Sequence, residues 1–351
     1  MRKINSPPLD HLLALSDDTG VIQHATHDVP NRSTGYCSDD VSRAFMVALA
    51  TLELEPRNET AAKLASVYLS FLHDAQMDDG WFHNFMSFDR RWLDDRGTED
   101  SFGRTVWALG YGMRYGKRDS WREVCARMLE KAMPRFTDLR YLRSVAYTII
   151  GLTHACESGL KDPMICRDSL RPLADAIKAS YLANRDADWQ WFENEMTYDN
   201  ARLCEAMLRA GLALRDDELI AIGLRTFAFY ERIVIENGMF VPIGSNGWYV
   251  RGGTRARYGQ QPLEVASLVD AALVAHECTS DPAFIAVAQL GFDWFYGHNT
   301  NGVQMAEHGG CRDGIDPQGP NPNMGAESTL AYLASACALA ERPAKGLTIA
   351  R

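Results

Sequence analysis

One pattern repeats six times along the 351-residue chain and constrains its fold more than any other feature. In each copy, a polar or acidic stretch runs directly into an apolar segment rich in Ala, Gly and Ser, with copies about 45–65 residues apart. The copies are SDDVSRAFMVALA (38–50), EDSFGRTVWALG (99–110), RYLRSVAYTIIGL (140–152), YDNARLCEAMLRAG (198–211), QPLEVASLVDAALVA (261–275) and AESTLAYLASACALA (326–340). Small side chains permit close approach on several sides, so the pattern predicts six buried helices.

Longer amphipathic patterns with charge on one face alternate with these segments and predict an outer set of helices. They lie at about 59–76, 120–134, 168–185, 216–233 and 281–297, and the N-terminal DHLLALSDD stretch is the only candidate for a sixth. The predicted fold class is all-α: an (α/α)6 barrel or toroid of alternating inner and outer helices, in a single domain over 1–351. Long loops and a small hairpin within 235–253 are expected at one end. An open helical-repeat scaffold that binds a peptide is the alternative, but long, dissimilar aromatic loops favour the closed ring.

Composition limits the function. The formal charge of -10 and pI near 5.4 argue against nucleic acid or an anionic membrane as principal partner, because both would repel the protein. The N-terminus makes a poor secretion signal, and no stretch is long and apolar enough to span a bilayer. Eight scattered cysteines without a C-x-x-C pair indicate reduced, buried thiols. We therefore expect a cytoplasmic protein.

Carboxylates precede or begin most of the inner segments. The candidate catalytic acids are Asp39, Asp40, Glu99, Asp100 and Glu327. A helix N-terminus favours negative charge, so capping explains one acid at each site but not the repeated pairs. Like charges held close together raise the pKa of one group, which can then donate a proton while the other stays ionised. Two such carboxyl groups are what glycosidic bond cleavage requires.

The connecting loops hold five of the eight tryptophans together with polar residues that could bind sugar hydroxyls. The candidate substrate-binding residues are Tyr36, Arg43, Trp81, His83, Asn84, Arg104, Trp189, Trp191, Glu193, Tyr198, Asp199, Gln261, Glu264 and Asp313. Each tryptophan could instead anchor its loop to the helices.

Other interpretations of the charged residues remain open. Asp199 could form an intrahelical ion pair with Arg202. Glu264 and Glu327 sit within apolar helices, where an unpaired acid is costly, so they either face a polar cavity or pair with arginines of neighbouring inner helices.

We expect no metal and no cofactor. His24 with His27, and His308 with Cys311, have ligand-like spacing, but neither has a matching second pair nearby. Nucleotide-binding and serine-hydrolase motifs are missing from the sequence.

Three motifs carry a resemblance over residues 20–342: GYCSDDVSRAF (35–45), TEDSFGRTVWALG (98–110) and GPNPNMGAESTLAYL (319–333). They resemble the six-hairpin glycosidase-like (α/α)6 toroid superfamily, in particular a bacterial domain found alone or fused to glycosyltransferases. The resemblance implies carboxylate catalysis on carbohydrate in a cleft at one end of the barrel, with Trp81, His83, Asn84 and Trp191 in the cleft. Val41 and Ser42 stand where the domain has Asn and Ala, which leaves the acid pair intact.

These observations predict a glycoside hydrolase that cleaves a bacterial oligosaccharide or polysaccharide fragment, with Asp39 or Asp40 opposite Glu99 or Asp100. A sugar epimerase on the same scaffold is one alternative; it would use two histidine bases, for which His83 and His308 are the candidates. A non-catalytic carbohydrate-binding domain that partners a glycosyltransferase is the other.

Overall fold

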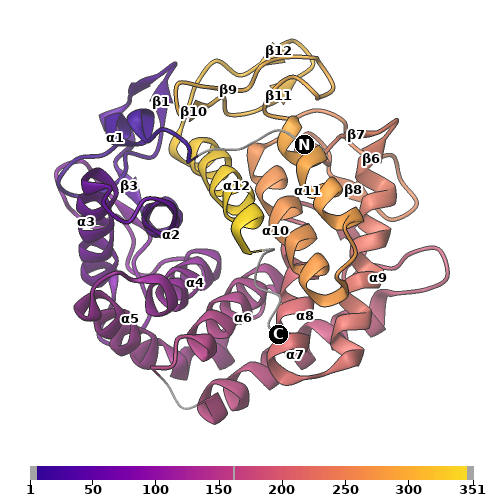
Figure 1. The fold of residues 1–351 in the computed structure, drawn as a ribbon, viewed down its shortest axis with the longest axis horizontal. Helices are drawn as coiled ribbons and strands as arrows, with labels where there is room; N and C mark the ends of the chain where they lie inside the picture. Colours follow the sequence, from indigo (N-terminus) through magenta and orange to yellow (C-terminus); the bar gives the residue numbers. More distant parts are fainter. Residues whose placement is uncertain (1–5, 161–162, 346–351) are drawn as a thin grey trace.

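The inner helices form a closed ring. The computed structural model describes residues 6–160 and 163–345. Its inner helices are α2 (Ser38–Leu54), α4 (Glu99–Tyr115), α6 (Leu142–Glu157), α8 (Ala201–Leu214), α10 (Pro262–Thr279) and α12 (Ala326–Lys345). Each packs against the next, and α12 packs against both α10 and α2, which closes the ring (Figure 1). The predicted (α/α)6 toroid is confirmed.

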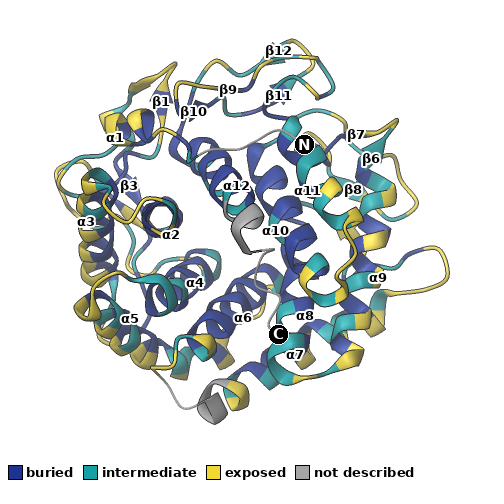
Figure 2. Cartoon of the chain, viewed as in Figure 1, coloured by how far each residue is buried: buried dark blue, intermediate teal, exposed yellow. Residues whose placement is uncertain are grey.

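An outer layer covers this ring. Its helices are α3 (Glu59–Ala75), α5 (Asp119–Ala132), α7 (Pro163–Asn184), α9 (Asp217–Val234) and α11 (Ala283–Asp293), each packed on the inner helix that precedes it. The sixth position is held by the short α1 (Asp10–Leu15), which packs against α12. The inner helices are buried almost throughout, whereas the outer helices expose one face (Figure 2).

Small residues bring the inner helices together as the sequence predicts. Where α4 crosses α6, a Cβ atom added at Gly110 would overlap the carbonyl oxygen of Gly151, and one added at Gly151 would lie 2.6 Å from the carbonyl oxygen of Val106. Only glycine allows the two backbones to approach this closely. The glycines therefore set the packing distance of this helix pair.

Short antiparallel strands tie the loops to one another. They are β1 (Ala25–Thr26) with β2 (Val29–Pro30), β3 (Tyr36–Cys37) with β4 (Phe85–Met86), β5 (Glu195–Met196) with β8 (Tyr249–Val250), β6 (Ile235–Glu236) with β7 (Met239–Phe240), β9 (Ala306–Glu307) with β10 (Gly310–Cys311), and β11 (Ile315–Asp316) with β12 (Gly319–Pro320). Two 3₁₀ turns, η1 (Arg32–Thr34) and η2 (Met133–Asp138), complete the described elements.

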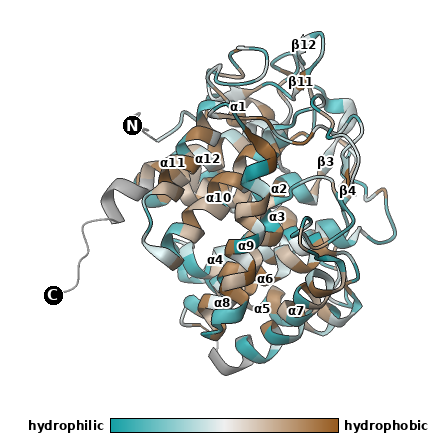
Figure 3. Cartoon of the chain, turned by 90° about the vertical axis from the view of Figure 1, so that its right-hand side faces the viewer, coloured by the Kyte–Doolittle hydropathy of each residue, from teal (hydrophilic) through white to brown (hydrophobic). Residues whose placement is uncertain are grey.

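Two of these strand pairs join different loops. β3 with β4 connects the loops that enter α2 and α4, and β5 with β8 connects those that enter α8 and α10. β3, β4, β11 and β12 lie on the side of the ring opposite the C-terminal end of α12 (Figure 3). The N-terminal ends of α2, α4 and α12 therefore meet beneath a connected loop layer.

The hairpin expected within 235–253 is present as β6 and β7, with Asn237 and Gly238 both at positive φ in its turn. Within the described residues, no helix combines the length and apolarity needed to cross a membrane. Cys37, Cys125, Cys204 and Cys311 are buried free thiols, whereas the side chain of Cys166 lies outside the described residues.

Candidate active site

Asp39 and Asp40 occupy the first turn of α2 and have different surroundings. Asp40 is buried and accepts hydrogen bonds from Arg43 Nη1 at 2.8 Å and Cys37 Sγ at 3.3 Å. Asp39 is half-buried, and its Oδ1 is buried without a hydrogen-bond partner among the described residues. Burial raises the pKa of Asp39 to about 7; Arg104 and Arg43 oppose this rise, and the negative charge of Asp100 adds to it.

Asp100 lies near Asp39 but is held in its ionised form. Its carboxylate accepts hydrogen bonds from Arg104 Nε at 2.9 Å and from the Tyr198 hydroxyl at 3.0 Å. Burial would raise the pKa of Asp100. The charge of Arg104 and the hydrogen bonds from Arg104 and Tyr198 instead hold this pKa below its ordinary value. The two aspartates are thus set up for opposite protonation states near neutral pH.

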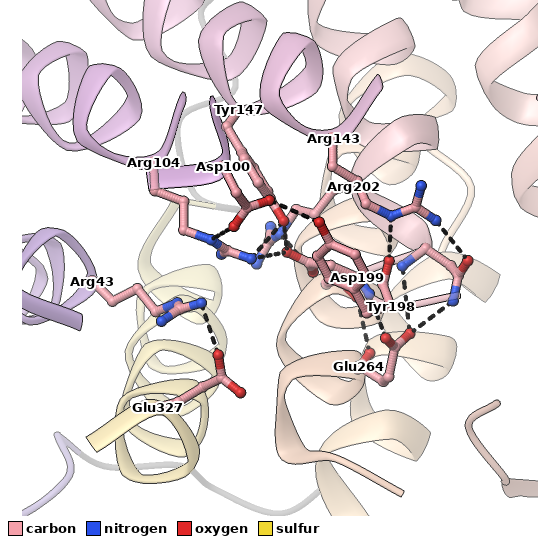
Figure 4. Close-up of polar contacts among 12 residues, drawn as sticks. Arg43, Asp100, Arg104, Arg143, Tyr147, Tyr198, Asp199, Arg202, Glu264 and Glu327 are labelled. Atoms are coloured by element: carbon pink, nitrogen blue, oxygen red, sulfur yellow. Dashed lines mark hydrogen bonds and ion pairs between the residues drawn. The ribbon is translucent and has the colours of Figure 1, made fainter. Parts of the chain in front are cut away.

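Asp199 belongs to the same hydrogen-bond network as Asp100, to which Arg104 links it (Figure 4). It is fully buried, and its Oδ2 accepts hydrogen bonds from the Tyr147 hydroxyl at 2.6 Å and Arg104 Nη2 at 3.2 Å. The same Arg104 nitrogen donates to Tyr147 at 2.6 Å. Arg202 Nε lies 3.5 Å from Asp199 Oδ1, so the expected Asp199–Arg202 ion pair is present. Asp199 is not helical, because α8 begins only at residue 201.

Glu264 holds the backbone that positions Asp199. Asp199 has a φ of 50°, a conformation that non-glycine residues seldom adopt, and its backbone N–H donates to the carboxylate of Glu264. Tyr230 also donates to Glu264, at 3.2 Å. Burial and the charge of Asp199 raise the pKa of Glu264 to about 7. Among the described residues, Glu264 has no arginine partner and does not line the central cavity described below, so its predicted ion pair is not seen.

Glu327 fits one predicted alternative. It pairs with Arg43 Nη2 at 2.9 Å, across the α12–α2 contact, while 39% of its side chain stays exposed. Asp313 accepts a hydrogen bond from the backbone N–H of Gly325 at 2.8 Å, and burial raises its pKa. His24 is close enough to act electrostatically on both Asp40 and Asp313. These groups extend the acid cluster, here defined as Asp39, Asp40, Asp100, Asp313 and Glu327.

Glu99 lies apart from this cluster's hydrogen-bond network. Its carboxylate accepts backbone N–H groups of Arg140 at 2.7 Å and Tyr141 at 3.0 Å, just before α6. The structure therefore gives Glu99 a capping role, and its expected pairing with Asp39 or Asp40 is not seen.

The structure also corrects the expected sugar platforms. Trp81, Trp189 and Trp191 are at most 3% exposed. Trp81 stacks on Phe102 with ring centroids 4.3 Å apart, and its Nε1 donates to the carbonyl of Gly97. These buried indoles anchor loops and offer no face to a ligand.

Other predicted binding residues are held by protein groups. Tyr36 is buried and donates to Asp17 at 2.6 Å. Glu193 accepts from Arg143 at 2.6 Å. His83 stacks on Trp92 and is bonded through Nδ1 to the carbonyl of Asp94.

For two further predicted binding residues, the hydrogen bonds are to residues outside the acid cluster. Asn84 is buried at the β3–β4 junction, where its carbonyl accepts the N–H of Ser38; its side-chain oxygen has no partner among the residues that the structure describes. Gln261 is half-buried, and its carbonyl accepts the N–H of Glu264 at the start of α10.

A cavity of about 520 Å³ occupies the centre of the ring. Arg43, Arg104 and Arg202 line it. Of the acids that bind these arginines, Asp40, Asp100 and Asp199 do not line it, whereas Glu205 and Asp270 do. Its other lining residues come from later turns of the inner helices, including Trp107, Glu205, Arg209 and Asp270. The cavity therefore extends from the arginines toward the C-terminal ends of the helices. The sequence interpretation missed Trp107, Tyr147 and Asp270, because a residue inside an apolar helix gives no sign of which side faces the ring centre.

Comparisons place the fold among known structures. No family profile matches the sequence, and no curated protein sequence matches it either. Cellobiose 2-epimerase from Bacillus thermoamylovorans superposes with a TM-score of 0.74 at 12% identity, covering 96% of each chain. A GH76 α-mannanase from Bacteroides thetaiotaomicron gives 0.62 at 10% identity, covering 96% of this chain and 95% of that one. The cellulase Cel9M of C. cellulolyticum gives 0.60 at 8%, covering 92% and 88%.

Structural similarity at such low sequence identity establishes the shared fold. It does not identify the reaction, because these structures include both an epimerase and hydrolases. With the closed ring and its paired helices, they show that this chain has an (α/α)6 toroid fold.

Proposed function

We propose that the protein is a carbohydrate-active enzyme that hydrolyses glycosidic bonds, with Asp39 as proton donor and Asp100 as the ionised partner. The observation that carries the proposal is the opposite displacement of the two pKa values: burial raises that of Asp39 to about 7, and Arg104 and Tyr198 keep that of Asp100 low. A protonated and an ionised carboxyl group side by side are the two reagents of glycoside hydrolysis.

Each acid has a defined chemical task in this proposal. Asp39 would protonate the leaving oxygen of a glycoside; its Oδ1 is buried and accepts no hydrogen bond from the described residues, so no protein group competes for its proton. Asp100 would either activate water or attack the anomeric carbon. Arg104 and Tyr198 stabilise its charge before the reaction and hold its orientation. Glu327 and Asp313, at the edge of the cluster, would bind sugar hydroxyls.

The epimerase is the second candidate, and the fold shared with cellobiose 2-epimerase favours it. It needs a base on each face of the carbon that loses its proton. Of the two histidines expected for this, His308 is exposed in the turn between β9 and β10, and His83 is bonded to Asp94. Asp39 and Asp100 could supply the two carboxyl groups that hydrolysis needs, which is why we prefer the hydrolase.

Activity on oligosaccharides tests the proposal. We expect wild-type protein to release new reducing ends from at least one member of a panel of bacterial oligosaccharides. Asp39→Asn and Asp100→Asn should each lower kcat by about 10²–10⁴-fold, the usual contribution of an acid or base. Asp95→Asn is the matched control, because Asp95 is an exposed aspartate in the same loop region.

Other outcomes select the alternatives. Exchange of solvent deuterium into the sugar without new reducing ends would favour the epimerase. Glycan binding without turnover would favour a carbohydrate-binding domain, and co-purification with a glycosyltransferase would then test the expected partnership. Full activity in both Asn variants would contradict the assignment of the two aspartates.

A further inference from the structure

The central cavity is separate from the acid cluster. Its lining begins at Arg43, Arg104 and Arg202 and ends near Tyr115 and Ser280, at the C-terminal ends of α4 and α10. None of the five acids of the cluster lines it. At about 520 Å³, it has the size of a small-molecule site. The proposed hydrolysis leaves this volume unused.

Unsatisfied donors gather on the cavity-lining residues. Trp107 Nε1 and Arg43 Nε are buried and have no hydrogen-bond partner among the described residues, whereas Arg202 Nε has the Asp199 carboxylate 3.5 Å away. The Trp107 and Arg43 side chains are at least nine-tenths buried. An unpaired buried donor costs about 1–3 kcal/mol, so two on the residues of one cavity indicate a missing acceptor. No described cavity-lining residue has an orphaned acceptor.

Two neighbouring side chains restrict how a ligand could approach the Trp107 indole. Arg202 lies over the ring with its guanidinium carbon 4.6 Å from the centroid, and Tyr147 stacks nearly parallel at 6.1 Å. These neighbours fix the indole, which makes Nε1 a donor of defined position. A hydrogen bond to it would therefore be specific for an acceptor at one place in the cavity.

Arginines outnumber acids among the residues that line the cavity. Five arginines line it, Arg43, Arg104, Arg114, Arg202 and Arg209, against three acids, Glu205, Asp270 and Glu277. Glu205 is fully buried and already accepts from Arg209 Nε at 2.6 Å and from Arg202 Nη1 at 2.5 Å. Asp270 accepts from Arg202 Nη1 at 2.7 Å. The acids of the wall are thus occupied. Arg43, Arg104 and Arg114 also pair with acids outside the lining, but a guanidinium has five N–H groups, so some remain for a ligand.

We propose that this cavity is a second binding site, for a small molecule that presents a carboxylate or phosphate to Trp107 and the surrounding arginines. Leu263, Leu273 and Leu330 line the same cavity and would pack against its carbon skeleton. The site shares no acid with the proposed hydrolysis, although Arg104 lines the cavity and also binds Asp100.

Calorimetric titration of the full chain tests this site. The probes are glucuronate for a carboxylate, glucose 6-phosphate for a phosphate, inorganic phosphate for the bare anion and glucose as the neutral control. We expect one of the two anionic sugars to bind at one site per chain, more tightly than glucose does. Trp107→Phe keeps a ring but removes the Nε1 donor, and should weaken binding about tenfold or more. Arg209→Gln should do the same, while Glu205 keeps its bond to Arg202.

Several results would overturn the proposal. These are the absence of binding by both anionic sugars, equal affinity for glucose, and wild-type affinity in both folded variants. Inorganic phosphate that binds as tightly as glucose 6-phosphate would show a bare ion site and contradict the small-molecule ligand. Asp39→Asn should keep wild-type affinity for the anionic probe. Loss of binding in that variant would place the ligand in the acid cluster instead. Hydrolysis is measured separately, so either proposal can fail alone.

Discussion

At the scale of residues, the candidate site depends on the different surroundings of two aspartates. Asp39 and Asp100 have the same chemistry, and only their neighbours separate their pKa values. Asp100 receives hydrogen bonds from Arg104 and Tyr198, whereas one oxygen of Asp39 is buried and has no donor in the described part of the chain. The distribution of donors thus decides which group stays protonated.

Asp39 should make the folded protein less stable as the pH rises. Its pKa is 3.8 in an unfolded chain and about 7 in the folded protein. Between these values the folded state binds more protons, so this contribution to stability is complete below pH 3.8 and is lost as the pH rises through 7. Asp39→Asn removes the ionisation, and the variant should gain stability relative to wild type from pH 5 to pH 8.

Thermal unfolding of both proteins across that range checks this prediction. Comparing the difference between the two proteins cancels the contributions of other buried acids, such as Glu264. A constant difference from pH 5 to pH 8 would mean that Asp39 does not titrate there.

The sequence identified acids at the correct helix ends but could not rank them. Glu99 and Asp100 are adjacent, yet one caps α6 and the other bonds to Arg104. Adjacent residues on a helix point about 100° apart, and which of them faces the ring centre depends on packing that a single segment does not encode. The sugar-binding role predicted for the tryptophans was wrong for a related reason. Trp81 and Trp191 are loop residues, but the connected loops bury them.

At the scale of elements, helix ends and helix crossings set the positions of the site residues. Glu99 belongs to α4 but satisfies two backbone N–H groups at the start of α6. Glu99→Ala should lower the free energy of unfolding by about 1 kcal/mol, the usual cost of a lost cap, while kcat stays unchanged. Denaturant titration measures the first and reducing-end release the second.

The control for this prediction is Asp95→Ala, which removes an exposed acid from the same loop region. It should leave stability unchanged. A large fall in kcat for Glu99→Ala would contradict this and would support the catalytic role that the sequence predicted for Glu99.

The close crossing of α4 and α6 predicts the sign of the change in the free energy of unfolding when a glycine there is replaced. Gly→Ala inside a helix ordinarily stabilises by about 1 kcal/mol. At Gly110 the new methyl would overlap the backbone of Gly151, so Gly110→Ala should instead destabilise by roughly 1–3 kcal/mol. Chemical denaturation gives the sign directly. A stabilised variant would show that the two helices are farther apart than the structure has them.

At the scale of the whole molecule, the ring was predictable and its interior was not. Six small-residue segments and their amphipathic partners define the order of inner and outer helices, including the short α1 at the sixth outer position. The central cavity depends on contacts among residues from different inner helices, such as Arg43, Trp107 and Asp270. Such distant residues are brought together only by ring closure, which local patterns do not report.

The account depends on a protonated acid beside an ionised one at the end of this closed ring. A site-resolved carboxyl NMR titration of Asp39 tests this claim most directly, in wild type and in Asp100→Asn. We predict that Asp39 titrates near pH 7 in wild type and at lower pH in the variant, because the variant removes a neighbouring negative charge and frees Arg104. Titration of Asp39 near pH 4 in both proteins would contradict the account.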